Sequence, residues 1–194
     1  MDKRRLLTAI DLAMVLTVFM LIRDNIGIPY PRSIEKFWEM RREIFRTGAA
    51  VLWLVALWLN LYAAWDGAAR VSKAALAWGA ALVVCVLSTH YFTRLIIESY
   101  KARLSQALYG ISMLITAAVS CMLQKALEAA NPDCPECVAA SVGYRRALTV
   151  AFDLLALGLA VSFVRFRAAA WYAVVAASVW LILTWCLRKG PLSD

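Results

Sequence analysis

Two aspartates lie inside long apolar runs of this 194-residue chain: Asp11 in Leu6–Ile22 and Asp153 in Ala147–Val164. A carboxylate inside a membrane-spanning helix is costly, so it marks either an ion or proton site or a hydrogen-bonded structural acceptor. The structural role is favoured for both. Asp11 lies close to the start of its run, where a helix N-terminus stabilises a carboxylate. Arg146 precedes Asp153 on nearly the same helix face, which predicts a role in helix packing.

Cys134 and Cys137 form a Cys-x-x-Cys turn, the spacing of a redox pair or of half a zinc site. A four-coordinate zinc site needs two further ligands, and the single histidine, His90, belongs to another predicted helix end. A membrane thiol oxidase needs a second cysteine pair, which the sequence does not offer. We therefore expect no metal and no cofactor, and a thiol-redox membrane protein using this turn stays as an alternative.

A third candidate is a stripe on the first apolar run. Leu16, Met20 and Arg23 fall within about 60° of one another on a helical wheel, and Ala9 and Ala13 continue the stripe. Bulky apolar residues continued by small ones suit either a close helix–helix seam or the lining of a narrow hydrophobic pore. Periodicity alone favours the seam.

The elements that must position these residues follow from composition. Hydrophobic residues make up 63% of the chain and the mean hydropathy is +0.68, whereas a soluble domain is close to half apolar. Runs of roughly 20 apolar residues are long enough to cross a bilayer as helices. We therefore predict an all-α integral membrane protein, residues 1–194 forming a single domain with six transmembrane helices. The predicted spans are Leu6–Ile22, Thr47–Trp65, Ala74–Thr93, Leu104–Leu123, Ala147–Val164 and Ala168–Leu187.

The segment Ile34–Phe45, before the second span, has a different pattern. Apolar side chains such as Ile34, Trp38 and Phe45 share one helical stripe, while glutamates such as Glu35 lie mostly off it. This pattern predicts an amphipathic helix at the membrane surface.

The net charge of +8 comes from basic residues in the connections between apolar runs, where anionic headgroups are nearer partners than nucleic acid. We therefore expect membrane lipids as partners and no nucleic acid. Lysine and arginine divide almost evenly between the two sides, so charge alone gives no orientation. The sequence contains no phosphate loop and no nucleophile–base pair, which argues against an enzyme.

The order of features over residues 4–125 resembles the transmembrane protein 175-like potassium channels, in their bacterial form of a single six-helix repeat. The chain is similar to a divergent member, because Ala9 and Ile10 stand where the family has Phe and Ser, and Asn60 where it has His. The segments that carry the resemblance are Arg5 with Ala9-Ile10-Asp11 and Ile28-Pro29, Trp58-Leu59-Asn60, His90-Tyr91-Phe92-Thr93, and Tyr109-Gly110.

The resemblance implies a homotetramer in which copies of the first helix line a pore for potassium or another monovalent cation. Leu16 and Met20 would form the pore constriction and Arg23 the pore mouth, with Asp11 as the signature residue. An arginine ring would repel cations unless its side chains turn outward or pair with Asp24.

The resemblance also gives Asn60, Tyr109 and Gly110 roles in helix packing. It implies a multi-pass protein of the bacterial inner membrane with both termini in the cytoplasm. The alternative function is a non-conducting membrane scaffold, or partner-binding subunit, of the same fold.

Overall fold

The computed structural model describes residues 3–26, 33–66, 68, 70–99, 102–133, 135–164 and 169–188, and all regular structure within these ranges is helical. The predicted all-helical fold with six long helices is confirmed, and one short helix accompanies them. In chain order the helices are α1 (Lys3–Ile26), α2 (Ile34–Glu39), α3 (Arg41–Asp66), α4 (Lys73–Glu98), α5 (Arg103–Ala130), α6 (Pro135–Val164) and α7 (Ala169–Arg188).

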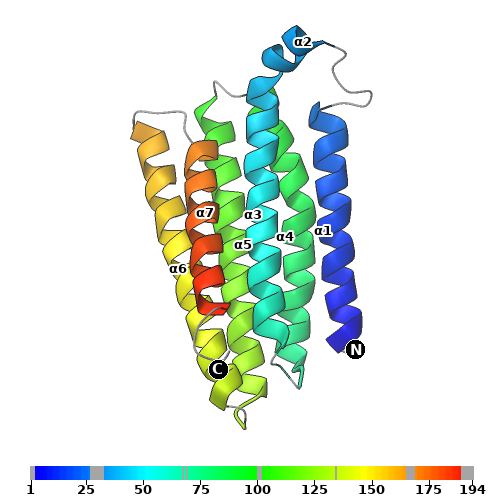
Figure 1. Ribbon diagram of the computed structural model, residues 1–194, viewed down its shortest axis with the longest axis vertical. Helices are drawn as coiled ribbons and strands as arrows, with labels where there is room; N and C mark the ends of the chain where they lie inside the picture. The colour runs from blue at the N-terminus through cyan, green and yellow to red at the C-terminus, as the bar shows by residue number, and fades with distance from the viewer. Residues whose placement is uncertain are drawn as a thin grey trace.

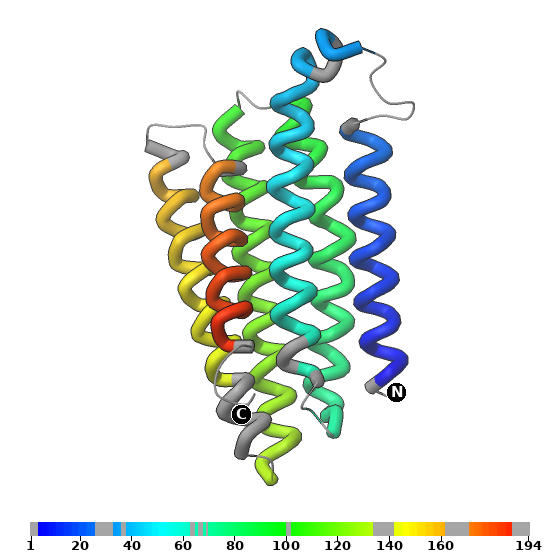
Figure 2. Tube along the Cα trace, in the orientation of Figure 1, coloured from blue at the N-terminus to red at the C-terminus, as the bar shows by residue number. Residues whose placement is uncertain are grey.

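The six long helices lie side by side along one axis, and α2 lies across one end of the bundle (Figure 1). α1 packs against α3 and α4, α5 packs between α4 and α6, and α7 packs against α3 and α6. As a result α1 and α6 lie at opposite edges of the bundle, each with one side turned outward (Figure 1). α1 begins and α7 ends at the same end of the bundle (Figure 2).

Within the residues that the structure describes, four helices are long and apolar enough to cross a membrane, over Arg4–Asn25, Arg41–Tyr62, Lys73–Glu98 and Arg103–Ala130. The shortest of these spans has 22 residues, about 33 Å of helix, which matches the thickness of the hydrocarbon core. In α7, Trp171–Leu187 forms a shorter apolar helix.

The predicted surface helix Ile34–Phe45 is divided at Met40. α2 ends at Glu39, and the residues from Arg41 onward belong to α3. Nη1 of Arg41 donates a hydrogen bond to the carbonyl oxygen of Trp38 at 2.6 Å. This side-chain bond lies where the two helices meet.

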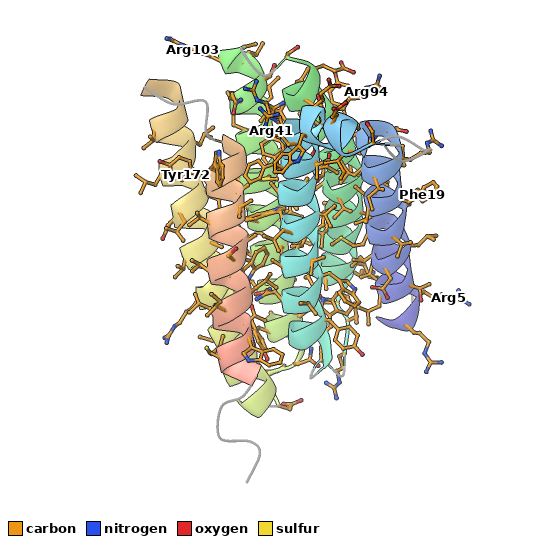
Figure 3. The ribbon with its side chains drawn as sticks, turned by 45° about the horizontal axis from the view of Figure 1, so that its top comes forward. Arg5, Phe19, Arg41, Arg94, Arg103 and Tyr172 are labelled. Atoms are coloured by element: carbon orange, nitrogen blue, oxygen red, sulfur yellow. The ribbon has the colours of Figure 1, made fainter. Side chains whose placement is uncertain are left out.

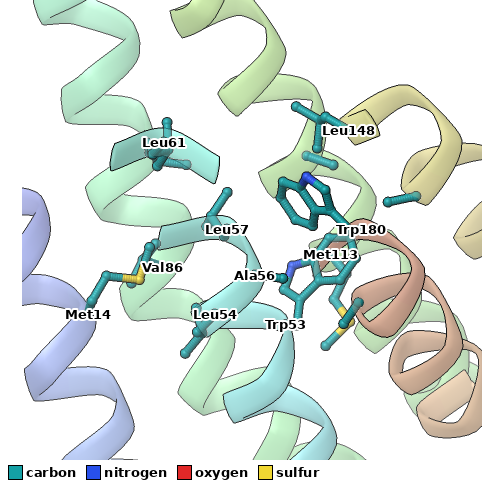
Figure 4. Close-up of a cluster of buried hydrophobic side chains, with 14 of the residues drawn as sticks. Met14, Trp53, Leu54, Ala56, Leu57, Leu61, Val86, Met113, Leu148 and Trp180 are labelled. Carbon is teal, nitrogen blue, oxygen red and sulfur yellow. The ribbon is translucent and has the colours of Figure 1, made fainter. Parts of the chain in front are cut away.

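The core of the bundle is built around two tryptophans. Trp53 of α3 and Trp180 of α7 are fully buried, and their ring centroids lie 5.2 Å apart. Leu57, Met113 and Leu148 surround them (Figure 4). This cluster packs α3, α5, α6 and α7 against one another. α1 in turn packs against α3.

The ends of α4 and α5 are joined by side-chain hydrogen bonds to the backbone. Ser72 caps the N-terminus of α4, where its Oγ accepts from the backbone N–H of Ala75 at 3.1 Å. The side-chain amide of Asn131, just after α5, accepts from the N–H of Arg70 at 2.8 Å and donates to the carbonyl of Arg70 at 2.9 Å. These bonds satisfy backbone groups where the chain leaves helical structure.

Candidate functional site

The outward side of α1 is apolar and bulky. Leu12 is 68% exposed, Val15 67% and Phe19 53%, although all three lie within a predicted span. The opposite side packs into the bundle through Leu6, Ile10, Met14, Thr17 and Leu21. In a protein within water such an exposed face would be unfavourable. Here it must contact lipid, another copy of the chain, or a narrow passage.

The predicted constriction residues lie on or beside this face. Leu16 is 46% exposed, Met20 is half-buried and Arg23 is exposed. The centre of the outward face passes through Leu12 and Phe19. The stripe predicted from the sequence, Leu16 and Met20, therefore lies beside that centre, on the side of α1 that packs against α4. Ala13, which the sequence placed on the same stripe, is buried.

The displacement has a structural cause at the contact between α1 and α4. A Cβ atom added to Gly79 would lie 2.8 Å from Cδ2 of Leu6, so the two helices approach closely there. This contact buries the side of α1 that carries Ala13. Sequence reasoning missed Leu12 and Phe19, although their spacing of seven residues was a signal that could have found them.

Asp11 points from the other side of α1 toward α3. Its Oδ1 accepts a hydrogen bond from the indole Nε1 of Trp58 at 2.8 Å. The carboxylate borders an apolar groove of about 450 Å³ between the two helices, which Met14, Val18 and Leu54 also line. Asp11 therefore faces roughly a right angle or more away from Leu16, and in this protomer it acts as a hydrogen-bond acceptor between helices.

A cluster of three ionisable side chains lies at the C-terminal end of α1. Nε of Arg23 lies 2.9 Å from Oδ1 of Asp24, and Nε2 of His90 on α4 lies 3.0 Å from Oδ2 of the same carboxylate. The side chain of Arg23 is 57% exposed and that of Asp24 is 19% exposed. Asp24 thus compensates the arginine charge and anchors the end of α1 to α4. Sequence reasoning gave no role to His90 in this cluster.

Comparison with known proteins gives one decisive result. No protein-family model matches the sequence, and no curated protein matches it. A crystal structure of a lysosomal potassium-selective channel TMEM175 homolog, from Chamaesiphon minutus, superposes with a TM-score of 0.76 at 19% sequence identity. The superposition covers 94% of this chain and 97% of that one. This chain has the TMEM175-type fold.

The match confirms the fold that the resemblance implied, and it extends beyond residues 4–125 to 94% of the chain. The similar protein is described as a potassium-selective channel homolog. Within the TMEM175-type bundle, the remaining predicted residues fall into two groups, one in the core and one at the edge opposite α1.

Asn60 is fully buried at the centre of a polar cluster that joins four helices. Its Oδ1 accepts from Nε2 of Gln124 on α5 at 2.6 Å. Its Nδ2 donates to Oγ1 of Thr184 on α7 at 3.3 Å and to the carbonyl oxygen of Tyr144 on α6 at 3.2 Å. Gln124 and Thr184 were not predicted from the sequence.

Tyr109 and Gly110 lie on the buried side of α5. A Cβ atom added to Gly110 would lie 2.6 Å from Cδ1 of Leu159, so the absence of a side chain allows α6 to approach α5 closely. The hydroxyl of Tyr109 is buried and has no hydrogen-bond partner within the described residues.

Asp153 is exposed on α6, and Arg146 is exposed as well. No ion pair joins the two in the part of the chain that the structure describes. The Cys-x-x-Cys turn is placed only in part: Cys134 lies outside the described residues, and Cys137 lies in the first turn of α6 without a described side chain.

Proposed function

We propose that the chain assembles as a homotetramer that conducts a monovalent cation, potassium, through a path surrounded by copies of α1. The observation that carries this proposal is the outward face of α1, where the bulky apolar side chains of Leu12, Val15 and Phe19 are each more than half exposed in the protomer. The TMEM175-type fold supports the same proposal, because the similar solved protein is a homolog of a potassium-selective channel.

In this assembly Leu16 and Met20 line the constriction, and Phe19 lies beside them on the same face. A ring of such side chains is too apolar for a hydrated cation and controls passage by dewetting. The wider face of Leu12 and Val15 contacts the neighbouring copies.

Arg23 lies at the mouth of the proposed path. An isolated ring of arginines would repel cations, but each guanidinium is bound to the carboxylate of Asp24. The partial compensation lets cations approach while leaving the mouth more positive than it would be without Arg23. Removing this arginine should therefore raise conduction.

The proposal also places the whole chain, residues 1–194, as a single domain that crosses a cell membrane six times. Both termini then lie on one side, the cytoplasmic side of a bacterial inner membrane. Lipids surround the outer helices, and Asp11, Asn60, Tyr109 and Gly110 hold α1 and its supporting helices in position.

The test uses the full chain, with native mass spectrometry for stoichiometry and potassium flux from liposomes for conduction. We expect tetramers in the wild type, measurable flux, and a several-fold increase in flux for Arg23→Ala. Arg103→Ala is the matched control, because Arg103 is exposed at the same end of the bundle (Figure 3) and should leave flux unchanged. Tetramers that stay silent in both the wild type and Arg23→Ala would instead identify a non-conducting scaffold.

A further inference from the structure

An elongated groove lies between α1 and α3, and Asp11 is the only charged residue that lines it. Its volume is about 450 Å³, which is within the range of ligand-binding pockets in proteins. The lining residues of α1 run from Asp11 to Ile22, which corresponds to roughly 16 Å of helix. Apart from Asp11 and Trp58, every lining residue is apolar. The groove therefore has one polar end and a long apolar wall.

One oxygen of the Asp11 carboxylate is bonded within the protomer and the other is not. Oδ1 accepts the indole N–H of Trp58 at 2.8 Å, whereas Oδ2 has no hydrogen-bond partner within the described residues. The side chain is half-buried, and none of the ion pairs in the described part of the chain involves it. Arg4, the nearest basic residue on the same face of α1, is seven residues away, about 10 Å along the helix. A carboxylate without a counter-ion in an apolar wall favours a cationic ligand.

The depth of Asp11 in the membrane suits the headgroup end of an amphiphile. Asp11 follows the start of the apolar run at Leu6 by five residues, about 8 Å of helix. A charged headgroup on a flexible chain can lie at this depth and remain close to the interface. From Asp11 the groove continues along α1 deeper into the hydrocarbon. Val55 and Trp58 on its α3 side are exposed, so an amphiphile can enter it sideways from the bilayer.

We propose that this groove binds a membrane amphiphile that has one apolar chain and a protonated amine as its headgroup. The ammonium group donates a hydrogen bond to Oδ2 of Asp11, and the chain lies along Met14, Val18 and Leu54. A hydrogen bond between two charged groups is stronger than one between neutral groups, and the low dielectric of the bilayer strengthens it further. A neutral alcohol makes only the weaker bond, and an anionic headgroup is repelled. The site requires only the packing of α1 on α3, and not ion conduction.

The test compares three amphiphiles that share one chain and differ in headgroup charge. The full chain in a non-ionic detergent is titrated with dodecylammonium, dodecanol and dodecanoate, and binding is read by native mass spectrometry. The solution is mildly alkaline, so that the amine is protonated and the fatty acid is ionised. Dodecylammonium should bind about tenfold more tightly than either of the others. Equimolar butylammonium should not displace it, because the short chain buries little apolar surface.

Three variants locate the site. Asp11→Asn keeps an acceptor for Trp58 and should lower the affinity for dodecylammonium to that for dodecanol, while dodecanol binding stays as in the wild type. Val18→Phe fills part of the groove and should weaken the binding of dodecylammonium and dodecanol alike. Asp153→Asn is the matched control, because Asp153 is an exposed carboxylate within another predicted span, and should bind as the wild type does.

Equal binding of the three amphiphiles, or an unchanged preference for the amine in Asp11→Asn, would overturn the proposal. Displacement of dodecylammonium by equimolar butylammonium would assign the carboxylate to a soluble amine and overturn the assignment to a membrane amphiphile. Binding confined to monomers would show that a neighbouring copy fills the groove in the assembly, and it would overturn the proposal as well.

Discussion

The outward face of α1 and the Asn60 cluster differ in polarity and burial in the opposite sense to a protein that folds in water. The face is apolar and exposed, with Leu12 and Phe19 at its centre, whereas the cluster is polar and fully buried. In hydrocarbon, side-chain hydrogen bonds have no water to compete with and are made between helices. The comparison separates two roles: the cluster holds the protomer together, and the face of α1 is the surface that we propose meets another copy or the permeating ion.

The largest expected effect comes from breaking the cluster. Asn60→Leu removes the partner of Gln124, Thr184 and the carbonyl of Tyr144. Each buried group left unpaired costs roughly 1–3 kcal/mol, so thermal unfolding of the purified protein should begin at a markedly lower temperature. The double variant Asn60→Leu with Gln124→Leu should recover part of the loss, because it removes both members of one pair. Additive losses in the double variant would contradict a direct contribution from this hydrogen bond.

A smaller effect is expected at Asp11, which lies between the two regions. Asp11→Asn keeps an acceptor for the indole N–H of Trp58, whereas Asp11→Leu leaves that donor unpaired at a cost of about 1 kcal/mol. The leucine variant should therefore assemble less well, and Trp58→Phe introduced with it should restore assembly. The measurement is the fraction of tetramer by native mass spectrometry. If both single variants assemble equally and differ only in ion flux, Asp11 is a permeation residue.

The two regions also differ in how far the sequence predicted them. Six long helices follow from six apolar runs, because hydrophobic length is a local property that a single sequence displays. The direction of Asp11 followed from helix periodicity in the same way. Gln124 and Thr184 lie 64 and 124 residues from Asn60, and no local pattern brings such partners together.

The same limit applies at the C-terminal end of α1. Pairing of Arg23 with its neighbour Asp24 could be anticipated, but the contribution of His90, 66 residues away, depends on how α1 and α4 pack. The predicted stripe through Leu16 and Met20 lies to one side of the centre of the outward face of α1. A helical wheel of α1 alone cannot show which side of that helix packs against Gly79 of α4.

No effect is expected from changes in the Cys-x-x-Cys turn, which belongs neither to the outward face of α1 nor to the Asn60 cluster. Changing Cys134 and Cys137 together to Ser should leave assembly and potassium flux as in the wild type, because the sequence supplies no further ligand for a metal at this turn. Metal analysis of the purified protein accompanies the flux assay. A stoichiometric metal in the wild type that is lost in the double variant would refute this prediction.

The central claim is that the outward face of α1 surrounds the ion path, and potassium flux through Leu16→Asn tests it most directly. Leu16→Ala and Met20→Ala accompany it, with native mass spectrometry of every variant. We predict intact tetramers in which all three changes increase flux and broaden selectivity, with the larger increases at Leu16, which is more exposed than Met20. If the face were only a helix–helix seam, the two alanine changes would each remove roughly 2–5 kcal/mol of packing. Weakened tetramers without added conduction would contradict the pore assignment.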